Sequence, residues 1–169
     1  MKKLLLAAVI GTGLLVSMCS TQDTQNVYCI SQYSAKADSA DRQAIRAFVV
    51  RKAMDSVYTT ASGLSYRIYN AGNPNRKPSA RSKVGVDYTG ALISTVDSLS
   101  DKQFDHGTHI NFTLNNVIKG WTEGLQLIGE GGRIRLMIPS YMAYGDCGNG
   151  TAVPSNIPLV FDIKLVQLY

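Results

Sequence analysis

Apolar and polar residues alternate along five segments of this chain in the way that β-strands require. The alternation covers residues 64–69, 83–93, 109–114, 133–138 and 159–168. Glycine, proline or asparagine interrupts the pattern between them, as at residues 71–75 and 145–150. Because successive side chains of a strand point to opposite faces, each segment can bury one face and expose the other.

Residues 38–60 carry apolar side chains at helical spacing instead. The stripe consists of Ile45, Phe48, Val49, Ala53 and Val57. Asp38, Ser39 or Asp41 can cap the start of this helix, and Gly63 follows its end. The pattern predicts one N-terminal helix ahead of the main domain, which we place at residues 61–169.

A second, shorter helix is predicted from about residue 116 to residue 128. Its apolar stripe consists of Val117, Ile118, Trp121, Leu125 and Ile128. Asn115 or Asn116 can cap it and Gly129 ends it. No strand–helix–strand alternation is present, so the sequence predicts an α+β fold. An antiparallel β-sheet of about five strands would wrap on this one short α-helix.

Residues 1–19 have the pattern of an export signal. Lys2 and Lys3 precede an apolar run over residues 4–16, which is too short for a comfortable transmembrane helix. The run ends at Cys19 in a segment that resembles a bacterial lipobox, in which the cysteine becomes the lipidated first residue. An ordinary cleaved signal, with Cys19 removed or left free, is the alternative. Lipidation would make the protein a periplasmic or outer-membrane lipoprotein of the cell envelope, tethered through the polar, flexible residues 20–37.

Two cysteines remain in the mature chain, Cys29 and Cys147. In an oxidising compartment they could form a disulfide, and two independent thiols are the alternative. The sequence does not decide between a disulfide and two free thiols.

Composition narrows the class of protein further. The 169 residues are 45% apolar and 17% charged, which is typical of a globular domain. Without Lys2 and Lys3, 15 of the 17 basic residues remain against 12 acidic ones, a net charge of +3. This charge is mild and no basic run interleaves with aromatic residues, so nucleic acid is not an expected partner.

Six short motifs follow one another in the predicted domain. They are Val-Asp-Tyr-Thr-Gly at 86–90, Phe104-Asp105, Val-Ile-Lys-Gly-Trp-Thr-Glu-Gly-Leu at 117–125, Ile138-Pro139, Ala-Tyr-Gly at 143–145 and Leu-Val-Phe-Asp-Ile-Lys-Leu at 159–165. In order and type these motifs resemble the FKBP-type peptidyl-prolyl cis–trans isomerases. The resemblance covers residues 61–169, the size of one such domain.

The resemblance implies a proline pocket and a set of polar groups around it. Substrate-binding positions would be Phe104, Ile110, Phe112, Val117, Trp121, Val153 and Phe161, with Trp121 as the floor. Catalytic positions would be Tyr88, Asp105, Tyr144 and the backbone N–H of Ile118. Tyr144 would donate its hydroxyl to a substrate carbonyl, and Asp105 would orient neighbouring hydroxyls. Taken singly, each of these residues could equally be a packing or turn residue.

The implied reaction is rotation about X-Pro bonds of polypeptides, for which no cofactor and no metal is needed. Macrolides are the inhibitors that the resemblance implies. His106 and His109 do not have standard metal-site spacing with the cysteines. The alternative function is a membrane-tethered chaperone or a module that binds proline-containing peptides with little turnover.

Three segments depart from the common pattern of these isomerases. The stretch between Leu92 and Phe104 is longer than in many members, and the one between Leu114 and Val117 is shorter. Ala152 stands where a larger apolar residue often overhangs the pocket. We expect these departures to affect macrolide affinity and catalytic rate more than the fold.

Overall fold

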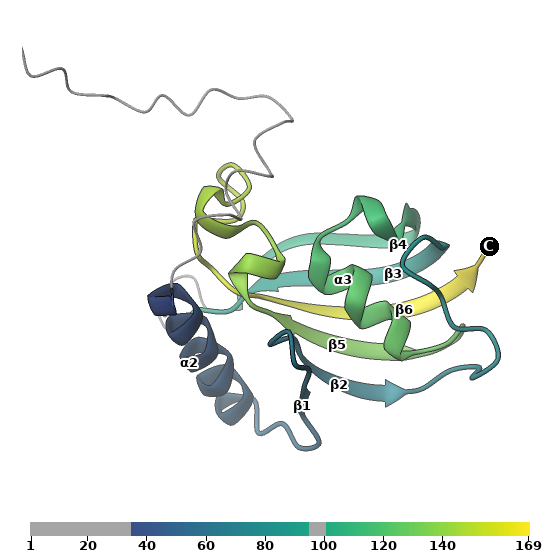
Figure 1. Cartoon of the computed structure of the whole chain (residues 1–169), viewed down its shortest axis with the longest axis horizontal. Helices are drawn as coiled ribbons and strands as arrows, with labels where there is room; N and C mark the ends of the chain where they lie inside the picture. Colours follow the sequence, from purple (N-terminus) through teal and green to yellow (C-terminus); the bar gives the residue numbers. More distant parts are fainter. Residues whose placement is uncertain (1–34, 95–100) are drawn as a thin grey trace, which may run out of the picture.

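The computed structural model describes residues 35–94 and 101–169 (Figure 1). The predicted signal over 1–19 with its lipidation site Cys19, the residue Cys29, and most of the tether over 20–37 lie outside these ranges. Within the described part of the chain, no helix combines the length and apolar character that a membrane crossing requires.

One antiparallel sheet forms the body of the domain (Figure 1). Its strands are β1 (Tyr58–Thr59), β2 (Ser65–Asn70), β3 (Lys83–Leu92), β4 (Gln103–Thr113), β5 (Arg133–Ile138) and β6 (Leu159–Leu168). They are ordered β1-β2-β5-β6-β3-β4, and every neighbouring pair is antiparallel. The predicted α+β class with an antiparallel sheet is therefore confirmed.

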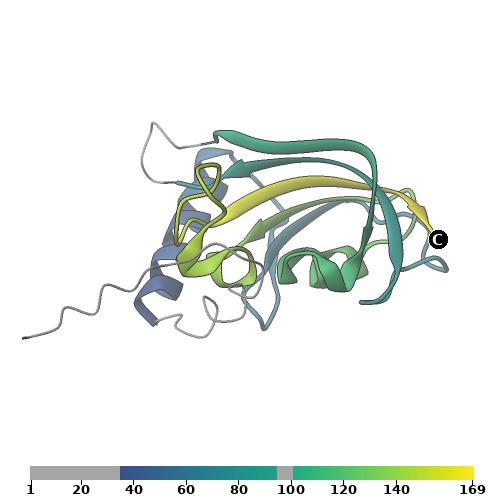
Figure 2. The ribbon, with the colours of Figure 1, turned by 90° about the horizontal axis from the view of Figure 1, so that it is seen from above.

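The short helix α3 (Lys119–Gly124) lies beneath the curved sheet (Figure 2). The 3-10 turns η1 (Leu114–Asn116) and η2 (Leu125–Leu127) flank it, so the helix predicted over 116–128 is divided into shorter pieces. Gly120 and Gly124 let α3 approach β5 closely, because a Cβ at either glycine would overlap the side chain of Ile138 or Leu136. The main apolar core fills the space between α3 and this face of the sheet.

The N-terminal helix α2 (Ala35–Arg51) lies at one end of the sheet (Figures 1 and 2). It covers the opposite face: Leu136 packs in the core under α3, whereas the next residue, Met137, packs against Ile45 and Phe48 of α2. This division follows from the alternation of side chains along β5. The strand thus belongs to two apolar clusters at once.

Two boundaries differ from the sequence prediction by more than three residues. The helix expected over 38–60 ends at Arg51, because Ala53 and Ser56 adopt positive φ and the chain then enters β1. The strand expected over 109–114 begins already at Gln103. As the last strand of the sheet, β4 has both faces largely open to solvent, so residues 103–108 carry no regular apolar alternation that would have marked them as a strand.

Candidate functional site

The side chain of Trp121, on α3, is the centre of an aromatic cluster. Its indole is only 4% exposed. The rings of Tyr88, Phe112 and Phe161 meet it edge to face, with centroid distances of 5.0, 5.5 and 5.2 Å and interplanar angles of 83°, 84° and 89°. Edge-to-face pairs of this kind are favourable by about 0.5–1.5 kcal/mol each beyond the area they bury. The four rings therefore hold one another in fixed orientations.

These rings border a cavity of about 80 Å³. The cavity is lined by Tyr88, Asp105, Phe112, Val117, Ile118, Trp121 and Phe161. Phe104 does not line it, but its ring centroid lies 5.7 Å from that of Phe161. Gly90 makes this contact possible, since a Cβ there would stand 2.5 Å from the Phe161 ring and 3.2 Å from the Phe104 ring. The structure thus brings together most of the residues that the motifs single out.

One carboxylate stands at the wall of this cavity. The Tyr88 hydroxyl donates to Asp105 Oδ2 at 2.9 Å, and the His106 backbone N–H donates to Asp105 Oδ1 at 2.8 Å. Burial, and then the hydrogen bond and charge of Asp105, raise the pKa of Tyr88 to about 12. The Tyr88 phenol therefore keeps its proton at neutral pH and holds the Asp105 carboxylate in place.

Tyr144 lines a second cavity that adjoins the first. This space of about 430 Å³ is bordered by Asn115, Asn116, Val117, Ile118, Lys119, Ala143 and Tyr144. Val117 and Ile118 line both cavities, so the two lie side by side and share these residues as a wall. Burial and the nearby charge of Asp105 raise the pKa of Tyr144, although a hydrogen bond with the Asn149 side chain opposes the rise. Its hydroxyl is consequently protonated and able to donate.

Two N–H donors from residues that line the smaller cavity lack acceptors within the described residues. Ile118 caps the start of α3, and its carbonyl accepts the Trp121 N–H at 3.0 Å, but its own N–H has no partner there. The buried indole Nε1–H of Trp121 likewise has none among the described side chains and backbone. Unsatisfied buried donors are rare in folded proteins, and they call for an explanation such as a ligand or a bound water.

Three of the expected pocket residues, Phe104, Ile110 and Val153, do not line either cavity. Ile110 is 41% exposed and lies beside Tyr88, since both side chains approach Gly107. Val153 is 1% exposed, packs in the main core and forms an isolated bridge with Asn149. Their roles in binding stay predictions.

Several residues that surround the site are not marked by the sequence motifs as site residues. Asn115, Asn116 and Lys119 line the larger cavity, and Asn149 bonds Tyr144. The first three lie next to the Val117-Ile118 pair in the sequence, and this position was the signal that could have marked them as site residues. Asn149 belongs to a loop, and its contact with Tyr144 depends on the path of that loop.

The described residues contain no group of three or more His, Cys, Asp or Glu side chains that could hold a metal ion. Cys147 is disulfide-bonded, and the other two cysteines of the chain, Cys19 and Cys29, lie outside the described ranges. Cys147 ends the 3-10 turn η4 (Gly145–Cys147), which follows Tyr144 directly.

Residues 74–166 match the model of a known family, described as FKBP-type peptidyl-prolyl cis-trans isomerase. The chain belongs to this family. It is 42% identical over 135 residues to a probable FKBP-type isomerase, FkpA, of Neisseria meningitidis, covering 79% of this chain and 48% of the relative. It is also 33% identical over 157 residues to the macrophage infectivity potentiator of Trypanosoma cruzi, covering 92% and 79%.

Solved FKBP-type structures share the fold. The crystal structure of FkpA from Escherichia coli has a TM-score of 0.66 and 34% identity, covering 82% of this chain and 62% of that one. An isomerase structure from Pseudomonas syringae has a TM-score of 0.65 and 35% identity, covering 79% and 93%. The chain spans less than half the length of the first bacterial FKBP-type relatives that it matches. The matched family region begins at residue 74, after α2, β1 and β2.

Proposed function

We propose that this chain is a peptidyl-prolyl cis–trans isomerase that accelerates rotation about X-Pro bonds in exported polypeptides. The observation that carries the proposal is the aromatic cavity around Trp121, with the Tyr88–Asp105 pair at its wall and Tyr144 beside it. A pyrrolidine ring is small, apolar and compact, and a dry aromatic cavity is a suitable site for such a group.

The reaction makes and breaks no covalent bond. Amide resonance sets the barrier to rotation at about 18–20 kcal/mol. The enzyme must bind the twisted bond, in which conjugation is lost, more tightly than either planar form. Water stabilises the polar planar amide, so the cavity walls formed by Tyr88, Phe112 and Phe161 favour the twisted state by excluding water.

Polar groups at the boundary of the two cavities would position the substrate chain. The Ile118 N–H and the protonated Tyr144 hydroxyl are donors suited to the two carbonyls that flank the proline. Asp105, held by the Tyr88 hydroxyl, supplies the negative field next to the bond that rotates. No group in this scheme needs a metal or cofactor.

A protease-coupled assay on a short X-Pro peptide tests this function. The protein should speed cis–trans exchange above the spontaneous rate, and a macrolide of the family's inhibitor class should slow it. Heat-denatured protein at the same concentration is the control for catalysis by contaminants of the buffer. If the folded protein binds the peptide without accelerating exchange, it is a peptide-binding module or chaperone instead.

We further propose that residues 1–19 direct export and that Cys19 carries a lipid anchor. The support is the sequence pattern of two lysines, an apolar run and a cysteine. Cys19→Ala should release the protein from the membrane fraction. If the wild-type mature chain begins at Ser20 or later and is already released, the lipid anchor is disproved and only export stands.

A further inference from the structure

Helix α2 lies outside the matched family region, but a buried carboxylate connects it to the loop that carries Tyr144. Asp41 Oδ2 accepts hydrogen bonds from the Ser140 N–H and the Ser140 Oγ–H, both at 2.7 Å. Asp41 is 2% exposed and Ser140 is 1% exposed. A carboxylate removed from water is costly unless hydrogen bonds compensate it, so the two groups are tied together rather than merely adjacent.

The segment from Ser140 to Tyr144 is short and largely buried, so Tyr144 can move little relative to Ser140. Ser140 begins the 3-10 turn η3 (Ser140–Met142), and its carbonyl accepts the Ala143 N–H at 2.9 Å. Met142 and Ala143 are both buried in the main core. Tyr144 follows at once and lines the larger cavity. A shift of Ser140 would therefore move the Tyr144 hydroxyl.

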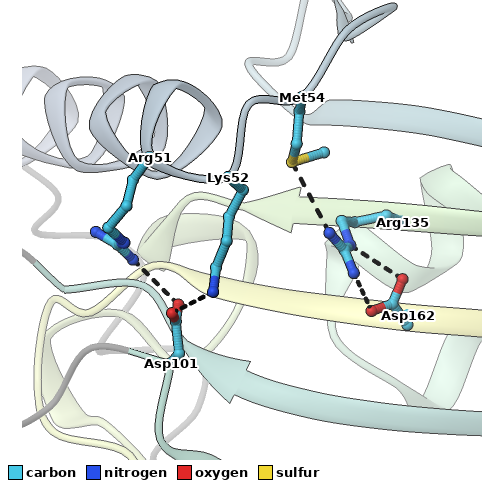
Figure 3. Close-up of polar contacts among 6 residues, drawn as sticks. All are labelled: Arg51, Lys52, Met54, Asp101, Arg135 and Asp162. Atoms are coloured by element: carbon cyan, nitrogen blue, oxygen red, sulfur yellow. Dashed lines mark hydrogen bonds and ion pairs between the residues drawn. The ribbon is translucent and has the colours of Figure 1, made fainter.

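The other end of α2 holds the segment that leads to Asp105 (Figure 3). Arg51 Nη2 lies 3.0 Å from one carboxylate oxygen of Asp101, and Lys52 Nζ lies 2.6 Å from the other. Burial acts to raise the pKa of Asp101, but the hydrogen bonds and positive charges of Lys52 and Arg51 together outweigh it and lower the pKa. Phe104 and Asp105 follow three and four residues later on β4.

Between these two contacts, apolar packing fixes the helix on the sheet. Ile45 and Phe48 pack with Ile93, Met137 and Val160. Just beyond the helix, the Met54 sulfur accepts a weak hydrogen bond from Arg135, at 3.9 Å, and Arg135 pairs with Asp162 (Figure 3). The middle of α2 thus packs on the sheet. Near its ends, polar contacts join it to the segment that leads to Tyr144 and to the segment that leads to Asp105.

We propose that α2 is a positioning element of the site and that Asp41 is a positioning residue, which places the Tyr144 hydroxyl through Ser140. The proposal rests on the isomerase function proposed for the site. It predicts that Asp41 affects turnover only through Tyr144, and not through the stability of the domain alone.

The test is a double-mutant cycle in kcat/KM on an X-Pro peptide, measured at equal folded fraction. Asp41→Asn removes the charge with little change in shape and should lower kcat/KM severalfold, up to about tenfold, the range of one displaced hydrogen bond. In a Tyr144→Phe background the same change should have an effect of less than about twofold. Asp38→Asn, one turn earlier on α2 and paired with the exposed Arg42, is the matched control and should change neither value.

A spectroscopic readout separates this proposal from the proposed function. Asp41→Asn should shift the backbone amide resonances of Ala143, Tyr144 and Gly145, whereas Asp38→Asn should leave them in place. If Asp41→Asn does not fold, Ser140→Ala removes one of the two hydrogen bonds and takes its place in the same cycle.

Equal effects of Asp41→Asn with and without the Tyr144 hydroxyl overturn the positioning role, as does an unchanged kcat/KM in Asp41→Asn. If the wild-type protein shows no turnover at all, the proposed isomerase function fails. The amide shifts then decide on their own: a shift at residues 143–145 upholds the positioning role of Asp41, and no shift overturns it.

Discussion

The face of the sheet that α3 covers is packed with apolar and aromatic side chains. The opposite face, which α2 covers, combines a small apolar cluster with charged groups. On the first face, Trp121 and Phe161 belong to a large core, with Asp105 only at its margin. On the second, the cluster around Phe48 is bordered by Asp41 and by the Arg135–Asp162 pair. Both faces are carried by the same strands, β5 and β6.

Apolar packing and polar contacts contribute differently to the structure. Burial of apolar surface is favourable but has little directional preference, so it can provide a dry cavity and stability together. Hydrogen bonds and ion pairs have defined lengths and angles, so they determine where a segment stands. In the proposals made above, the α3 face supplies the binding cavity and the α2 face supplies the placement of the loops around it.

The largest expected effect concerns the α2 face. Phe48→Ala leaves a cavity at the centre of the small cluster and should lower the free energy of unfolding by about 3–5 kcal/mol. Val50→Ala, at a side chain of the same helix that is 79% exposed, should stay within about 0.5 kcal/mol of wild type. Chemical denaturation of both variants measures this. Equal midpoints for the two would show that α2 is not docked on the sheet in solution.

The next effect concerns the α3 face. Trp121→Leu removes the floor of the cavity and should lower kcat/KM by more than about tenfold at equal folded fraction, because dryness and shape are lost together. Leu125→Ala, in the same core but outside the cavity lining, should cost about 2–5 kcal/mol of stability with little change in kcat/KM. A Trp121→Leu variant as active as wild type would contradict catalysis by a dry, closely fitting cavity.

A smaller effect is expected from a single hydroxyl. Tyr144→Phe removes one hydrogen bond, worth about 0.5–1.5 kcal/mol net, so kcat/KM should fall by about tenfold or less. Tyr141→Phe is the matched control, since its hydroxyl donates to the Ser62 carbonyl and lines neither cavity. Loss of all activity in Tyr144→Phe alongside an active Trp121→Leu would place the catalytic effect in the hydroxyl instead of the cavity.

The smallest effect is a pH dependence. Because the folded-state pKa of Tyr88 is raised to about 12, its contribution to stability is fully present below the ordinary tyrosine pKa of about 10. The contribution is lost as the pH rises from about 10 through 12. Ultraviolet absorbance titration should show a phenol ionising near pH 12 in wild type that is missing in Tyr88→Phe. Titration of Tyr88 near pH 10 would show that its burial and its bond to Asp105 are not maintained.

Sequence alone determined the elements in which buried and exposed side chains alternate regularly. The segments 133–138 and 159–168 are strands β5 and β6 with the predicted bounds, because central strands bury apolar residues on a regular period. The motifs around Tyr88, Trp121 and Phe161 led to the family and to residues that do line one cavity. Their catalytic roles stay predictions, since geometry alone does not measure turnover.

Only the tertiary structure decided the contacts that depend on the path of the chain. Asp41 and Ser140 are 99 residues apart in sequence, and Arg51 and Asp101 are 50 apart, so no local pattern marks them as partners. The end of α2 at Arg51 was likewise hidden, since the apolar spacing of residues 38–60 continues past it. A periodic pattern reports which side chains avoid water, and it carries no information on which distant polar groups satisfy one another.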